Sequence, residues 1–162
     1  MGKAQVNSQV FVYILTFIIT AALLIFGYNS VNNTIKNTKK MEMANFKTRI
    51  QSDFNEISSD YSSVKTKTYT VPSDISEVCF YQEGEIYDFR PMPFSYPLID
   101  DSIRDTENNV FLVNNDGLID AMDFGNIKII NEDYNIICIK PQEKKLNLRL
   151  EGIGDSVLVK QA

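Results

Sequence analysis

The chain has 162 residues, of which 44% are hydrophobic and 23% are charged, a composition typical of a folded domain. Its net charge of −5 argues against binding to nucleic acid, because an acidic surface repels the phosphate backbone. The sequence contains no histidine, which excludes Ser-His and Cys-His catalysis and histidine-based metal sites. We therefore predict a protein that is not an enzyme and has no cofactor, although hydrolysis by a pair of carboxylates stays open.

The first predicted element is a membrane-spanning helix over residues 10–28, preceded by a short leader of residues 1–9. No charged residue occurs between Lys3 and Lys36, and residues 10–28 read VFVYILTFIITAALLIFGY. At about 1.5 Å per residue this segment is about 28 Å long, close to the hydrocarbon thickness of a bilayer. A cleaved secretory signal usually has a shorter apolar core and small residues at the cut, so we expect this helix to be retained.

Residues 29–61 contain neither proline nor glycine, and we predict that they continue the helix as an amphipathic stalk. The polar run at residues 29–33 is the predicted place for a kink or a break in the helix. Apolar residues recur at helical spacing and form one narrow stripe: Phe46, Ile50, Phe54, Ile57 and Tyr61. This stripe either packs against the chain's own folded domain, which we favour, or forms a coiled-coil or assembly surface.

Residues 62–162 change to short runs of β-branched and aromatic residues between turns. The predicted strands are 64–71, 77–82, 85–89, 110–113, 126–130, 134–140, 146–150 and 156–160. Strands 77–82 and 85–89 flank a Glu-Gly turn and predict a hairpin, and the prolines of 90–109 predict an irregular loop. The predicted fold class is α+β: a long N-terminal membrane and stalk helix, then a mostly antiparallel β domain, sandwich-like or a twisted sheet.

Cys79 and Cys138 each lie in the centre of an apolar predicted strand. Two thiols without histidine do not complete a four-ligand zinc site. They are either two buried thiols or one disulfide, and a disulfide would place the domain in an oxidising compartment.

The sequence contains two further polar motifs. Asn32-Asn33-Thr34 is a glycosylation sequon, which makes Asn32 a candidate for modification. Residues 114–117 (NNDG), with Asp120 and Asp123, are similar to a calcium loop. However, an EF-hand register would need an acidic residue where Leu112 stands, so we interpret residues 114–117 as a turn.

Residues Lys3-Ala4-Gln5, followed by an uncharged helix, resemble the class III signal of type IV pilin-like proteins, particularly the archaeal kind. In that family a prepilin peptidase would cut between Ala4 and Gln5. The resemblance implies a pilin-like structural subunit, anchored in the cell membrane as a single-pass protein with its β domain outside and able to assemble into a filament. The implied partners are membrane lipid, copies of itself or other pilin-like subunits, and the peptidase. Gln9 replaces the glutamate that many pilins use to neutralise a neighbouring subunit's amine.

A different function and a different orientation also stay open. The alternative function is a monomeric membrane-tethered envelope protein whose β domain is a binding module, with residues 90–109 as its recognition loop. Lys36, Lys39 and Lys40 follow the membrane helix and, by the positive-inside rule, favour a cytoplasmic β domain. The pilin-like leader favours the outside, and that is the orientation we predict.

Overall fold

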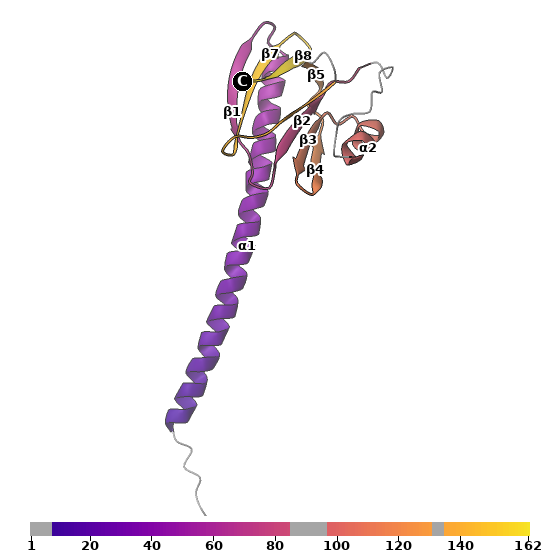
Figure 1. Ribbon diagram of the computed structural model, residues 1–162. Coiled ribbons are helices and arrows are strands. Elements are labelled where there is room, and N and C mark those ends of the chain that lie inside the picture. Colours follow the sequence, from indigo (N-terminus) through magenta and orange to yellow (C-terminus); the bar gives the residue numbers. More distant parts are fainter. Residues whose placement is uncertain (1–7, 85–96, 131–134) are drawn as a thin grey trace, which may run out of the picture. The chain divides into compact units, whose positions relative to one another are not determined.

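The computed structural model describes residues 8–84, 97–130 and 135–162. The chain divides into two compact units, one ending at Met41 and the other beginning at Glu42. Helix α1 (Ser8–Ser58) contributes its first part to one unit and its last part to the other (Figure 1). The predicted boundary of the β domain at residue 62 therefore lies about five helical turns after the start of the second compact unit.

Helix α1 is uninterrupted, so the chain does not break its helix at residues 29–33. Polar side chains there bond to the helix's own backbone: the Thr34 hydroxyl donates to the Ser30 carbonyl at 2.9 Å, and Thr38 donates to Thr34 at 3.0 Å. These bonds leave the backbone ladder intact. The helix ends at Ser58, before Tyr61, and Ser62 adopts a positive φ of 64° as the chain turns into the first strand.

The second unit contains two four-stranded sheets, which confirms the α+β class. The first sheet has the order β1 (Val64–Thr70), β7 (Lys145–Gly152), β8 (Ser156–Gln161) and β5 (Asn126–Ile129). The second sheet has the order β4 (Gly117–Met122), β3 (Val110–Asn114), β2 (Glu77–Tyr81) and β6 (Ile136–Ile139). The strand pairs are antiparallel except for β5 with β8.

The main core is built from the last part of α1 and the inner faces of both sheets. The ring of Phe54 stacks on Phe80 of β2 with centroids 6.0 Å apart and tilts against Phe124 at 5.1 Å. Buried side chains of the stripe and of β7 complete the centre: Phe46, Ile50, Ile57, Leu146, Leu148 and Leu150. The stripe therefore packs against its own domain, as predicted, except that Tyr61 lies beyond the helix and is exposed.

A second apolar cluster lies on the other face of the second sheet, beneath α2 (Pro97–Asp105). Figure 1 shows α2 beside β3 and β4. The cluster joins buried Ile99 of α2 to side chains of the sheet: Cys79, Phe111, Val113 and Ile136. This helix replaces the irregular loop that was predicted for residues 97–105, because proline is tolerated in the first turn of a helix, where a backbone N–H has no partner within the helix. Residues 90–96 of the predicted loop lie outside the described ranges.

Strand β2 pairs with a neighbouring strand on each side. Cys79 lies opposite Phe111 of β3 on one edge and opposite Cys138 of β6 on the other. The other strand of the predicted hairpin, residues 85–89, lies outside the described ranges. The observed hairpin joins β3 to β4 through the predicted turn, where Asn114 lies opposite Gly117.

Candidate functional site

The apolar part of α1 is the first candidate functional surface. None of the described side chains from Val10 to Tyr28 is buried. The hydroxyls of Thr16 and Thr20 donate to the carbonyls of Val12 and Thr16, both at 2.8 Å, so these polar groups are satisfied within the helix. An exposed, uncharged helix with internally satisfied polar groups suits a hydrocarbon environment. α1 is therefore long and apolar enough to cross a membrane.

Two predicted modification sites belong to the N-terminal part of the chain. The predicted peptidase site, Lys3-Ala4-Gln5, lies outside the described residues. Asn32, the predicted glycosylation site, is exposed but lies within continuous α1, and the hydroxyl of Thr34 in its sequon donates to Ser30. Sequons that are modified usually lie in surface loops, so the helical setting does not favour modification of Asn32.

Ion pairs link the last part of α1 to strands of both sheets. Lys67 of β1 contacts Asp53 at 2.9 Å, and Lys65 contacts Glu56 at 2.6 Å. The hydrogen bond from Lys65 lowers the pKa of Glu56, and the same bond raises the pKa of Lys65.

Lys47 of α1 pairs with Asp120 of β4, and burial lowers the pKa of Lys47. Asp120 belongs to the segment that is similar to a calcium loop, and two other residues of that segment, Asn114 and Asp123, accept hydrogen bonds within local turns. Asn114 accepts a hydrogen bond from the amide of Asp116 at 2.8 Å, and Asp123 accepts one from Gly125 at 2.8 Å. These contacts support the interpretation of the segment as turns.

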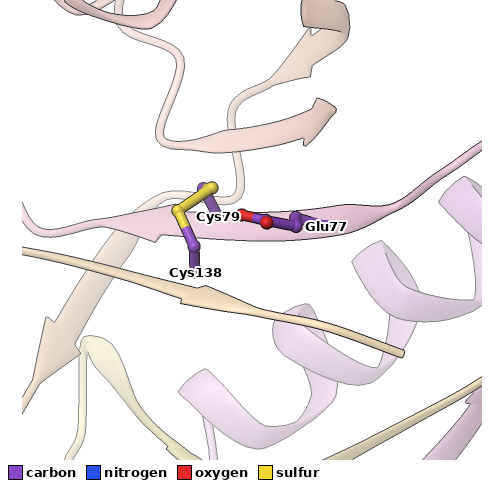
Figure 2. Close-up of side chains that lie close together, drawn as sticks. All are labelled: Glu77, Cys79 and Cys138. Carbon is purple, nitrogen blue, oxygen red and sulfur yellow. A yellow bond between two sulfur atoms is a disulfide. The ribbon is translucent and has the colours of Figure 1, made fainter. Parts of the chain in front are cut away.

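Cys79 and Cys138 form a disulfide across β2 and β6 (Figure 2). The residues lie directly opposite one another, with α-carbons 4.0 Å apart and a sequence separation of 59. Residues opposite each other on antiparallel strands project to the same face, which brings both sulfur atoms into the cluster under α2. The disulfide therefore connects an edge strand to the centre of the second sheet.

Glu77 lies beside this disulfide and was not singled out from the sequence. It stands two residues before Cys79, so both side chains project from the same face of β2. Figure 2 shows its carboxylate next to the two sulfur atoms. Lys140, at the end of β6, places its Nζ atom 3.2 Å from Glu77 Oε1. In the sequence, the spacing of two between Glu77 and Cys79 indicates that their side chains share a face of the strand. That Cys138 lies beside them is known only from the pairing of β2 with β6.

A cavity of about 320 Å³ lies between α1 and the end of β1. Glu42, Arg49 and Lys144 line it with charges of both signs, next to buried Tyr69. No described group hydrogen-bonds to the Tyr69 hydroxyl in this geometry. Burial, and secondarily the neighbouring Asp53 carboxylate, raise the pKa of Tyr69 far above its usual value. The mixed charges of the lining do not indicate one class of ligand.

Comparisons with protein families, with curated proteins and with solved structures find no match for this chain. Its description therefore rests on its own residues. Over the described part of the chain, one helix is able to cross a membrane, and a domain of two sheets contains a disulfide within its second sheet.

Proposed function

We propose that this chain is a non-enzymatic, pilin-like structural subunit, anchored in the cell membrane by α1 and able to join a filament. The observation that carries the proposal is the difference in burial between the two parts of one helix. Its first part exposes apolar side chains from Val10 to Tyr28, and its last part buries Phe46, Ile50 and Phe54 in the β domain. In a filament, the exposed parts of neighbouring helices would pack together and the β domains would form the outer layer.

The proposed orientation places the β domain outside the cell. The disulfide supports this, because disulfides persist in oxidising compartments and are rare in the cytosol. Lys36, Lys39 and Lys40 oppose it under the positive-inside rule. We give the disulfide more weight, because the pilin-like leader favours the same orientation. The proposed prepilin peptidase cut in this leader lies between Ala4 and Gln5. The proposed partners are membrane lipid, copies of the chain or related subunits, and that peptidase.

The mature N-terminus tests the pilin part of the proposal. The full chain is expressed in a host with a prepilin peptidase, and the N-terminal residue is identified by mass spectrometry. We expect Gln5 to be the first residue, and we expect Ala4→Phe to block the cut because a small residue is required there. A mature chain that keeps Met1 or Gly2 in such a host would contradict the proposal and favour the tethered binding module.

Assembly in the membrane is tested separately. Ala22 is small enough to let neighbouring helices approach closely. We expect chemical cross-linking to capture oligomers of the full chain, and we expect Ala22→Phe to reduce their yield more than Leu24→Phe, which replaces one large residue by another. A chain that stays monomeric under these conditions would contradict filament assembly and favour the alternative function, a membrane-tethered binding module. The predicted recognition loop of that module, residues 90–109, lies partly outside the described residues.

A further inference from the structure

We propose that the dithiol form of the domain binds one zinc ion through Cys79, Cys138 and Glu77. A carboxylate oxygen of Glu77 and the two sulfur atoms all lie within 4.8 Å of one another (Figure 2). Among the residues that the structure describes, this is the one group of three metal-ligating side chains at such distances. The site exists only in the reduced, dithiol form of the domain, and the proposed structural function does not depend on that form.

The ligands already stand on a common face of two paired strands. Cys79 lies opposite Cys138, and Glu77 precedes Cys79 by two positions. In a tetrahedral site with zinc–sulfur distances of about 2.3 Å, two sulfur ligands lie about 3.8 Å apart. Once the sulfur–sulfur bond is broken, rotation about the Cα–Cβ bonds can supply this separation without moving the strands. Three protein ligands leave the fourth position to water, as in other open zinc sites.

The charges around the site also favour a bound zinc ion. Two thiolates and one carboxylate carry three negative charges, so a Zn²⁺ complex would have a net charge of −1. The Lys140 ammonium lies 3.2 Å from Glu77 and would make the whole group neutral. Cys79 is fully buried and Glu77 is mostly buried, and a neutral group is favoured where charges are largely removed from bulk solvent. Lys140 itself is largely exposed and can adjust its position.

The disulfide and the metal exclude one another. A phosphine reductant and one water convert the disulfide to two thiols: the phosphine supplies two electrons and becomes the phosphine oxide, and water supplies its oxygen and the two thiol protons. Zinc then displaces these two protons to solvent and binds both thiolates. The ion would link β2 to β6 wherever the thiols stay reduced, replacing the disulfide as a connection between the edge strand and the sheet.

The test uses the full chain in detergent micelles. The protein is reduced with a phosphine, freed of reductant without air, and titrated with Co²⁺ as a spectroscopic probe. We expect a sulfur-to-cobalt charge-transfer band that saturates at one equivalent, tetrahedral d–d bands, and loss of both when Zn²⁺ is added. The oxidised chain should give neither signal. Absence of these bands in the reduced, folded chain, or equal bands in the oxidised chain, would overturn the proposal.

Two variants test the ligand set. We expect Cys138→Ser to abolish the charge-transfer band, and Glu77→Gln to weaken zinc binding by about 10–100-fold, whereas Glu83→Gln at an exposed position should leave it unchanged. If Glu77→Gln bound zinc as tightly as the unchanged chain, the Glu77 carboxylate would not be a ligand. Binding to a folded site should raise the thermal midpoint of the reduced chain, measured by circular dichroism. A midpoint that zinc leaves unchanged or lowers would show binding to unfolded thiols and contradict the proposal.

Discussion

At the residue scale, Gly152 connects the end of α1 to the first sheet. Its amide donates to the Ser63 carbonyl at 2.9 Å, and its own carbonyl accepts from Ser62 at 2.8 Å. A β-carbon at this position would overlap the carbonyl oxygens of Ile57 and Asp60, where the helix ends. Both obstacles are backbone atoms that cannot rotate away, so a residue without a side chain is required for the close approach.

We therefore predict that Gly152→Ala destabilises the domain. Overpacking typically costs about 1–3 kcal/mol, and we expect the upper end here or more, because helix and strand must separate to admit the methyl group. The measurement is the free energy of unfolding of the full chain in denaturant. Gly27→Ala is the matched control, since nothing lies within 4 Å of the added atom there. Equal effects of the two substitutions would show that the junction tolerates a side chain.

Tyr69 is the residue whose environment predicts a pH dependence. Because its pKa is raised in the folded state, it stays protonated above pH 10, whereas the unfolded chain releases the proton near that pH. The stabilisation is complete below pH 10 and decreases above it, by at most about 1.4 kcal/mol per pH unit. We expect Tyr69→Phe to remove this part of the loss between pH 10 and 11 and to have little effect at pH 7, since no described group bonds the hydroxyl. Parallel stability curves for both proteins above pH 10 would contradict this.

At the element scale, the last part of α1 serves as a core element of the β domain. Phe54 is fully buried and contacts Phe80 and Phe124 from other elements. The ion pairs of Lys47, Lys65 and Lys67 lie at the partly exposed margins of this packing, where an ion pair contributes little to stability.

We predict that Phe54→Ala lowers the free energy of unfolding by about 3–5 kcal/mol, because it removes a large buried ring and leaves a cavity. Tyr61→Ala serves as the control, since Tyr61 continues the same sequence stripe but is 75% exposed, and we expect a change within about 0.5 kcal/mol. Thermal unfolding followed by circular dichroism distinguishes the two. A small effect of Phe54→Ala would mean that the helix contributes little to the core.

At the scale of the whole molecule, the chain combines an apolar helical unit with a unit that has its own core. We predict that the full chain fractionates with membranes and resists carbonate extraction, because the uncharged segment from Val10 to Tyr28 is fully accessible to lipid. A shortened chain of residues 42–162 keeps both sheets and the buried stripe, so it should be soluble and should unfold cooperatively. Recovery of the full chain in the carbonate-soluble fraction would contradict the membrane anchor.

The features that the sequence alone determined are periodic or compositional. The uncharged segment, the spacing of Phe46, Ile50 and Phe54, and the alternation around Leu148 each follow from hydrophobicity along a single stretch of chain. A helix or a strand shows its buried face at regular intervals, whatever it packs against. The α+β class and most strands could therefore be predicted before any contact was known.

Tertiary structure decided the features that depend on which segments meet. Strand β4 has no clear apolar alternation and is recognised through its pairing with β3. The pairing of β2 with β6 joins strands that lie far apart in the sequence. The same pairing placed Cys79 opposite Cys138 and brought Glu77 and Lys140 together, across more than 55 residues of sequence. Local periodicity states which face of a strand is buried but not which strand lies beside it, since that choice depends on packing throughout the domain.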